Sequence, residues 1–219
     1  MKSTPEHIDE MIRKMPYIDE MLAEGLINTT ALARRLQPEL EKRCGREVQV
    51  GGIVMAIKRR PTDVFIRQSE RIEAFLSKIT DITVRSHLID YTFQQTATLR
   101  RQITELLGVL SKDQQAFYAI SQGIRETTLV VSRSHASALE NLMKNEKLVS
   151  RVDGLSAITA VLPMENLNTP GVYYYIFRQI AQRGLNIFEV ISTANEFTIL
   201  VAHHEVEQAF ALLNQLGRR

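Results

Sequence analysis

The chain has 219 residues, of which 44% are hydrophobic and 24% are charged. This length fits two or three small domains, and this composition allows a packed core and argues against global disorder. No apolar run approaches the roughly 18 residues that span a bilayer. A basic start followed by an apolar stretch is not seen either, so we expect a cytoplasmic protein without a secretory signal or membrane contact. Cys44, the single cysteine, forms neither an internal disulfide nor a thiolate metal site alone, which agrees with a reducing compartment.

The formal net charge of +2 is too small to indicate a nucleic-acid partner by itself. The charge is unevenly distributed, however. Residues 1–25 carry three basic and six acidic side chains, whereas residues 34–60 carry eight basic and three acidic ones. Such a run is most often the solvated surface of helices. The alternative is a basic face directed at phosphate groups.

The beginning of the chain is expected to be helical. Apolar side chains recur every three or four positions over residues 5–24, and Pro16 is expected to divide this stretch into two helices. Another helix is expected to begin after Asn28 or Thr29, whose side chains can accept hydrogen bonds from free backbone N–H groups. Pro38 is expected to interrupt that helix.

Residues 47–50 are β-prone, and residues 52–60 form a candidate short helix that Pro61 ends. Several short helices within such a length are typical of a helix-turn-helix module. We therefore interpret residues 1–66 as a small helical, helix-turn-helix-like domain. A connecting helix at residues 67–80 is expected to join it to the rest of the chain.

From residue 81 onward the pattern changes. Segments rich in β-branched and aromatic residues alternate with amphipathic segments in the order β-α-β-β-α-β over residues 81–151, and the first five elements of this order recur over residues 152–219. Phe117-x-x-Ile120-Ser121 is repeated about 70 residues later as Phe188-x-x-Ile191-Ser192. The predicted fold class is α+β: a small helical domain followed by two ferredoxin-like βαββαβ modules, each an antiparallel sheet with helices on one face.

Four motifs of the second repeat follow one another in a recognisable order and spacing. They are Asn168-Thr169-Pro170-Gly171-Val172, Gly184-Leu185-Asn186-Ile187, Glu189-x-Ile191-Ser192 and Glu196-x-Thr198-Ile199. Together they resemble the C-terminal regulatory ACT domains of aspartate kinases. The whole chain also resembles a family of uncharacterised microbial helix-turn-helix–ACT proteins. The Lys-Phe-Gly-Gly phosphate loop that opens the catalytic domain of aspartate kinases is missing, so we expect a regulatory protein and not an enzyme.

The resemblance implies a binding site for an amino-acid effector. The turn formed by Asn168, Thr169, Pro170, Gly171 and Val172 opens a helix whose first N–H groups can bind a carboxylate, and Gly171 leaves room for the ligand. In the ACT family this turn and the residues that open the next strand hold the effector, usually across a dimer interface; here those residues are Asn186 and Ile187. Alternatively, Asn168 and Thr169 only cap the helix. A bulky residue in place of Gly171 is expected to block the ligand, provided that the φ angle there is negative.

The remaining candidate sites carry weaker signals. The corresponding turn of the first repeat, Gln94–Thr98, lacks the Pro-Gly pair, so we expect no ligand there. His203 and His204 are adjacent on an expected strand and point to opposite faces, which makes a poor metal chelate. Neither an acid–base pair nor a nucleophile elbow is apparent, and we expect no catalytic residues, no cofactor and no metal site.

Two functions remain open for the N-terminal helices. In the first, the protein is a ligand-responsive transcriptional regulator in which basic side chains contact DNA phosphates: Arg34, Arg35, Lys58, Arg59 and Arg60. In the second, the helices bind a protein partner or a second copy, and the protein is a regulatory or interaction subunit assembled through its ACT domains. We expect a homodimer or larger assembly in either case, because no closing strand follows the last helix. That leaves a sheet edge to be paired by another chain or by an earlier segment of the same chain.

Overall fold

The computed structural model describes residues 2–15, 17–61 and 63–218, with backbone only for residues 63–68. Backbone contacts divide the chain into two compact units, Met1–Arg71 and Ile72–Arg219, which are considered separately below. Within the described residues, no helix combines the length and the apolar character needed to cross a membrane.

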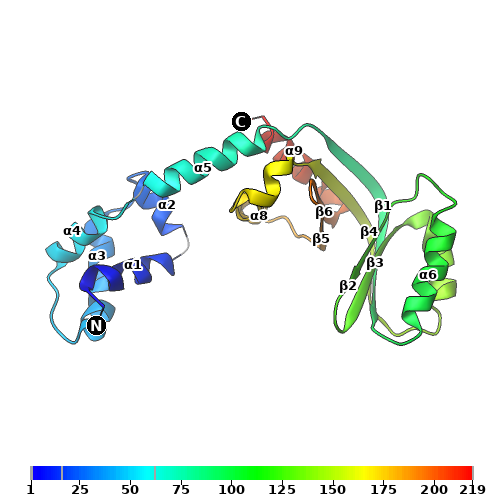
Figure 1. Ribbon diagram of the computed structural model, residues 1–219, viewed down its shortest axis with the longest axis horizontal. Helices are drawn as coiled ribbons and strands as arrows, with labels where there is room; N and C mark the ends of the chain where they lie inside the picture. Colours follow the sequence, from blue (N-terminus) through cyan, green and yellow to red (C-terminus); the bar gives the residue numbers. More distant parts are fainter. Residues whose placement is uncertain (1, 16, 62, 219) are drawn as a thin grey trace. The chain divides into compact units, whose positions relative to one another are not determined.

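The N-terminal unit is built from short helices (Figure 1). The apolar faces of the first four helices share one core, which includes the fully buried Ile12, Leu36, Leu40 and Ile53. The helices are α1 (Thr4–Arg13), α2 (Ile18–Ala23), α3 (Thr29–Cys44), α4 (Val50–Lys58) and the beginning of α5 (Asp63–Leu76).

The helix boundaries in this unit follow the sequence patterns with one exception. The division of the first stretch into two helices is confirmed, although Pro16 itself lies outside the described residues. Asn28 caps α3, accepting hydrogen bonds from the N–H groups of Thr30 and Ala31. The expected interruption at Pro38 is wrong, because α3 continues through it. Proline removes one helical hydrogen bond, but the fully buried Leu36 and Leu40 on either side keep both turns packed on the core.

The β-prone segment 47–50 forms no strand; it is a connection that leads into α4. Side chains of α3 satisfy its backbone. The N–H of Val48 donates to Glu41 Oε1 at 3.1 Å, and its carbonyl accepts from Gln37 Nε2 at 3.0 Å. The buried Val48 side chain joins the core of the unit, so the pattern reflected burial and not strand pairing.

In the C-terminal unit, six strands form one antiparallel sheet in the order β2-β3-β1-β4-β6-β5. The expected order of strands and helices is present in both halves. The elements are β1 (Ile82–Gln94), α6 (Leu99–Leu110), β2 (Tyr118–Gln122), β3 (Glu126–Ser132), η1 (Arg133–His135), α7 (Ala136–Leu142), β4 (Leu148–Val161), η2 (Met164–Asn168), α8 (Val172–Gln182), β5 (Glu189–Ser192), β6 (Glu196–Ala202), η3 (His203–Glu205) and α9 (Val206–Leu216).

The two long central strands belong to both halves of the sheet. Residues 88–94 of β1 pair with β3, whereas residues 82–85 pair with residues 157–160 of β4 and close the second half. An earlier segment of the same chain thus fills the edge for which no closing strand was found in the sequence. The pairing of β1 and β4 shifts register between Arg85 and Leu88, beside two left-handed residues, His87 (φ 61°) and Gly154 (φ 72°). Such an irregularity bends a sheet.

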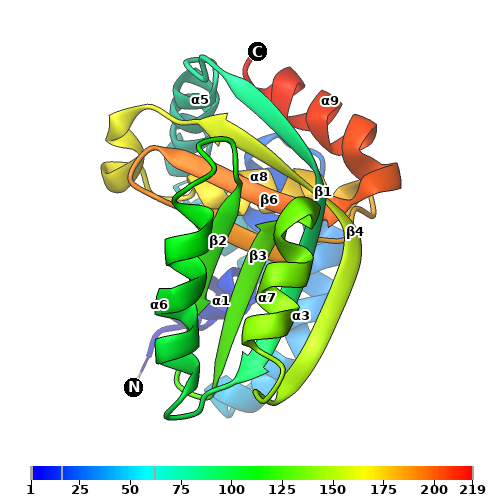
Figure 2. The ribbon, with the colours of Figure 1, turned by 90° about the vertical axis from the view of Figure 1, so that its right-hand side faces the viewer.

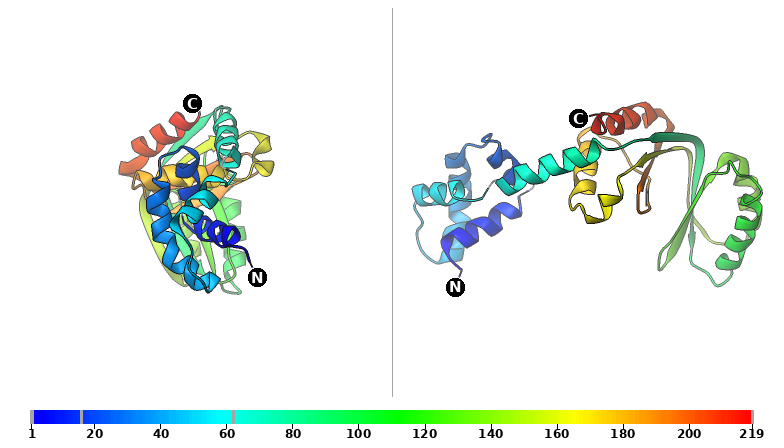
Figure 3. Two further views of the ribbon diagram at one scale, coloured as in Figure 1. Left: turned by 90° about the vertical axis from the view of Figure 1, so that its left-hand side faces the viewer. Right: turned by 45° about the horizontal axis from the view of Figure 1, so that its top comes forward.

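Each half covers one face of the sheet with helices. In the first half, α6 and α7 pack on β1 and β3 around Tyr91 and Leu129 (Figure 2). In the second half, α8, α9 and the last turn of α5 pack on β4 and β6 around Ile158 and Phe197 (Figure 3). The opposite, helix-free face forms a smaller core of Leu88, Val130, Leu155, Ala157 and Leu200. The strands of the second half cross behind those of the first in Figure 2.

Candidate functional site

The turn that opens α8 contains exposed residues and a glycine with a positive φ angle. Gly171 is the residue before the helix and has a φ angle of 94°. Among the residues that the structure describes, no side chain accepts a hydrogen bond at this helix start. Thr169 instead donates from Oγ1 to the carbonyl of Glu165 at 2.8 Å, and Asn168 ends the preceding η2 helix. The alternative in which Asn168 and Thr169 cap α8 is therefore wrong. The condition of a negative φ at Gly171 is not met either.

A hydrogen-bonded chain of side chains lies beside this turn. Asn166 of η2 donates from Nδ2 to Tyr173 Oη at 2.9 Å, and Tyr173 Oη lies 2.7 Å from Ser192 Oγ at the end of β5. The Asn166 side chain is buried, and its Oδ1 accepts no hydrogen bond from the described residues. The sequence patterns did not single out Asn166, because η2 is not part of any periodic pattern. Tyr173 lies in the first turn of α8, where the sequence predicts a helix but not the contact with Asn166 and Ser192.

Asn186 and Ile187 lie at the other end of α8. The helix has 11 residues, so about 16 Å of helix separates them from the opening turn. Asn186 is exposed, and its N–H donates to Glu205 Oε1 at 3.5 Å. Ile187 packs against the core of this half, as does Val172 in the turn. Within one chain, the structure does not bring the two groups of predicted residues together.

The equivalent helix start in the first half is closed by its own side chains. Thr96 Oγ1 accepts a hydrogen bond from the N–H of Leu99, the first residue of α6, at 3.1 Å. The hydroxyls of Thr96 and Thr98 both donate to the carboxylate of Glu146, which comes from the loop before β4. A negative charge of the chain itself therefore already lies beside the N-terminus of α6, where a ligand carboxylate would otherwise be favoured.

Four of the five predicted DNA-contacting residues have exposed side chains. Arg34 and Arg35 lie on α3, and Lys58 and Arg59 lie at the end of α4. Within residues 2–15, 17–61 and 63–218, no ion pair or side-chain hydrogen bond holds any of these four groups.

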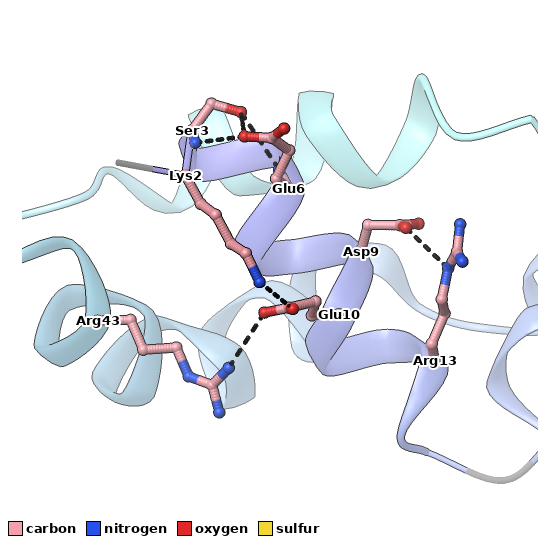
Figure 4. Close-up of polar contacts among 7 residues, drawn as sticks. All are labelled: Lys2, Ser3, Glu6, Asp9, Glu10, Arg13 and Arg43. Carbon is pink, nitrogen blue, oxygen red and sulfur yellow. Dashed lines mark hydrogen bonds and ion pairs between the residues drawn. The ribbon is translucent and has the colours of Figure 1, made fainter.

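Arg60 differs from these four, because its side chain is only 11% exposed. Its Nη2 pairs with Asp9 Oδ1 at 2.9 Å and with Asp19 Oδ1 at 2.8 Å, which ties the end of α4 to α1 and α2. Arg43 and Arg13 are likewise engaged by acidic residues of α1, as Figure 4 shows. The acidic start of the chain thus neutralises part of the basic segment from within the unit, and Arg60 is unsuited to a phosphate contact.

The sequence matches no protein-family model and no curated protein. Solved structures do match. The aspartate kinase of Clostridium acetobutylicum, described as an allosteric enzyme, gives a TM-score of 0.53 at 15% identity over 63% of this chain and 34% of that one. The ligand-free regulatory subunit of aspartate kinase from Thermus thermophilus gives 0.51 at 12% identity over 63% and 97%. Aspartokinase alpha and beta subunits give 0.51 at 17% identity over 63% and 97%.

These likenesses establish the fold of the sheet-bearing part of the chain. It is the mixed α+β, ACT-like fold of aspartate kinase regulatory regions, with a six-stranded antiparallel sheet. This chain spans nearly the whole of the T. thermophilus regulatory subunit but only about a third of the C. acetobutylicum kinase. In the T. thermophilus protein the shared part is the regulatory subunit of the kinase.

Proposed function

We propose that this protein is an amino-acid-sensing regulator whose effector binds at the N-terminus of α8. The observation that carries the proposal is the difference between two equivalent helix starts on one ACT-like sheet. Glu146 and two threonines close the start of α6, whereas no side chain caps the start of α8. The site is therefore expected in the second half only.

The chemistry of this turn suits a small zwitterion. Backbone N–H groups at a helix start attract a carboxylate through their partial positive charge. The ammonium group of the ligand needs an acceptor, and Asn166 Oδ1 is a buried acceptor without a hydrogen bond from the described residues. Tyr173 and Ser192 hold Asn166 in place through the hydrogen bonds given above. Burial of an unmet acceptor is costly, and a bound ammonium would remove that cost.

Asn186 and Ile187 are proposed to complete the site from a second copy. They lie at the far end of α8 in the same chain, so they can approach the turn only if two copies associate with these helices antiparallel. This arrangement agrees with the expectation of a homodimer.

Calorimetric titration with each of the twenty amino acids tests the site. One or a few small amino acids are expected to bind to the full chain. Asn168→Glu adds a carboxylate beside the start of α8 and should weaken binding at least about tenfold by repulsion of the ligand carboxylate. Asn145→Glu makes the same charge change at an exposed loop position of the first half and should leave binding unchanged. Equal affinity for both variants would move the site away from α8. Gly171→Leu is a poor test, because the positive φ strains any side chain.

We further propose that the N-terminal unit binds DNA through Arg34, Arg35, Lys58 and Arg59, with α3 and α4 as the helix-turn-helix. The support is that these four cations are exposed and have no ion pair with any described residue, whereas Arg60, Arg43 and Arg13 are held by carboxylates. Gly51 and Gly52 leave the first turn of α4 without side chains, so backbone can approach a phosphate there.

A gel-shift assay on random duplexes at two salt concentrations tests this contact. The double variant Lys58→Ala with Arg59→Ala should weaken binding about equally for all sequences, and each lost contact should lower the salt slope by about 1. Lys112→Ala with Lys144→Ala removes the same charge from the C-terminal unit and should have no effect. Unchanged low-salt affinity of the first variant would contradict the DNA contact.

One observation favours the alternative of a protein-binding unit. The N-terminal unit exposes several large apolar side chains: Tyr17 (46%), Met21 (42%), Leu26 (66%) and Met55 (51%). Exposed apolar side chains that gather in a patch mark interaction surfaces. This alternative holds if the parent protein gives no gel shift with DNA and if Leu26→Glu lowers its mass in light scattering to that of a monomer. The exposed side chains then serve association, and the N-terminal unit is an interaction module.

A further inference from the structure

A cavity of about 250 Å³ lies between the two edge strands of the sheet. Residues 119–121 of β2 and residues 128 and 130 of β3 form one wall, and residues 189–192 of β5 form the other. It opens on the helix-free side, away from α6 and α7. Given that a water molecule occupies about 30 Å³ of liquid, the cavity holds roughly eight waters or a ligand of similar volume.

A buried carboxylate lies on β1, the strand that pairs with the β3 wall of this cavity. Asp90 of β1 is 7% exposed, and its Oδ1 has no hydrogen-bond partner among the described residues. Asp90 is directly opposite Val130 in the pairing of β1 with β3. Residues opposite each other on neighbouring strands project from the same face of the sheet, and Val130 lines the cavity. The Asp90 carboxylate is therefore aimed into the same space.

A second carboxylate faces Asp90 from the opposite wall. Glu189 of β5 lines the cavity. Burial of Asp90, the larger cause, and the negative charge of Glu189, the second, together raise the pKa of Asp90 to about 6. No positive group lowers that pKa, and in the described part of the chain no ion pair engages either carboxylate. Two like charges facing each other without a counter-ion are unfavourable unless something positive enters between them.

We propose that this cavity is a second ligand site, specific for a small primary alkylammonium group held between Asp90 and Glu189. The ammonium supplies three donors and one positive charge to acceptors that are otherwise unmet. The alkyl part lies along Val130, Ile191 and Ala119, and the hydroxyls of Ser121 and Thr128 accept a polar end. This site is separate from the amino-acid site at α8 and does not depend on it.

The composition of the cavity favours an organic cation over a metal ion. Among the described residues, no group of three or more His, Cys, Asp or Glu side chains could hold a metal, whereas Mg²⁺ and Ca²⁺ require six or more oxygen ligands. The apolar members of the wall offer nothing to a hydrated metal ion but match a hydrocarbon chain.

The two sites are linked through one serine. Ser192 lines the cavity and also receives the hydrogen bond network of Tyr173 and Asn166 beside the start of α8. Because Ser192 belongs to both, the two ligands are expected to influence each other's affinity.

Titration of the full chain with n-butylammonium, followed by NMR chemical shifts at pH 7.5, tests the proposal. Shifts are expected for residues 119–121 and 189–192. The neutral isostere 1-butanol is expected to bind to the parent at least about tenfold more weakly than n-butylammonium does. The Asp90→Asn variant is expected to bind n-butylammonium at least about tenfold more weakly than the parent does. Glu189→Gln, on a partly exposed edge strand, gives a second variant with the same expected loss should Asp90→Asn fold poorly. Glu196→Gln removes an exposed carboxylate from the neighbouring strand and should not change binding.

Three results would overturn the proposal. They are equal binding of 1-butanol, unchanged binding by both Asp90→Asn and Glu189→Gln, or shifts produced by Mg²⁺ or Ca²⁺ and not by the amine. The amino-acid titration of the same variants separates this site from the proposed function. Loss of n-butylammonium binding with retained amino-acid binding supports two sites, whereas loss of amino-acid binding alone concerns α8 only.

Discussion

Asp90 shows how one side chain can make the stability of the unit depend on pH. Its carboxyl ionises near pH 3.8 when the chain is unfolded and only at about pH 6 when it is buried beside Glu189. Below pH 3.8 both states are protonated and the group has no effect. Between these values the folded state holds the extra proton, so the free energy of unfolding falls as the pH rises. Above about pH 6, burial of the ionised Asp90 lowers the free energy of unfolding by a constant amount of about 3 kcal/mol.

Asp90→Asn should remove this cost, because the amide is neutral at every pH in this range. The variant is expected to be more stable than the parent at pH 7.5 and to lose that advantage at pH 4. Urea unfolding at pH 4, 5, 6 and 7.5 measures the difference. If the two stability curves run parallel across this range, the pKa of Asp90 does not differ between the folded and unfolded states.

At the scale of the element, α4 is a short helix with two adjacent glycines. Gly51 and Gly52 are exposed, and a Cβ at either position would meet nothing within 4 Å. Gly52→Ala should therefore stabilise the N-terminal unit by about 0.5–1 kcal/mol. If DNA backbone approaches this turn, the same variant should bind DNA more weakly in spite of its greater stability.

Gly108→Ala is the matched control for that experiment. Gly108 is also exposed, within α6, and also has open space around its Cα, so the C-terminal unit should gain a similar free energy of unfolding. Its DNA affinity should equal that of the parent. Denaturant unfolding and the gel-shift assay report the two quantities independently, and an unaffected DNA affinity in Gly52→Ala would leave the glycines without a role in binding.

The sequence located the helices and strands well, but it did not show where one long strand runs through the boundary between the two repeats. Periodic apolar residues located every helix from α1 to α9 within a few positions, since that signal is local. The sequence pattern placed one strand at the end of the first repeat and another at the start of the second, whereas the structure has the single strand β4 with the left-handed Gly154 inside it. The expected module boundaries at 81 and 152 stay predictions, although β4 runs unbroken through 152.

Long-range pairings were beyond the reach of a sequence pattern. Arg60 was grouped with its basic neighbours, yet Asp9 and Asp19, some 40 to 50 residues earlier, hold its guanidinium. Asp90 stood in an ordinary strand, and only the folding of β5 opposite β2 and β3 brings Glu189 beside it. Such charges acquire their roles when distant segments meet, which local periodicity does not encode.

For the whole molecule we predict a homodimer. Residues 82–85 close the second half internally, so an unpaired edge there no longer argues for association. The argument now rests on the proposed effector site, whose Asn168–Val172 and Asn186–Ile187 segments lie at opposite ends of α8. Light scattering should give twice the mass of one chain, with a larger dimer fraction when the amino acid is present. A monomer at all concentrations with undiminished amino-acid binding would restrict the site to one chain.

The last prediction concerns transmission from α8 to the helix that leads back toward the N-terminal unit. The last turn of α5 packs on α8 in the core of the second half, and Tyr175 Oη donates to Glu73 Oε1 at 2.8 Å. Both ends of this bond belong to the C-terminal unit. A ligand at the start of α8 that shifts this helix would therefore act on α5 directly.

If the amino acid changes DNA affinity by some factor, DNA must change amino-acid affinity by the same factor. Gel shifts with and without the amino acid, and calorimetry with and without DNA, should therefore give the same factor of change in affinity. Tyr175→Phe keeps the buried ring and removes only the hydroxyl, so amino-acid binding alone and DNA binding alone should be nearly unchanged. The common factor should fall toward 1, because a hydrogen bond to a carboxylate is worth about tenfold or more in an equilibrium. A factor that survives in Tyr175→Phe would place the coupling elsewhere, and unequal factors in the two assays would mean that the effector and DNA are not linked through one equilibrium.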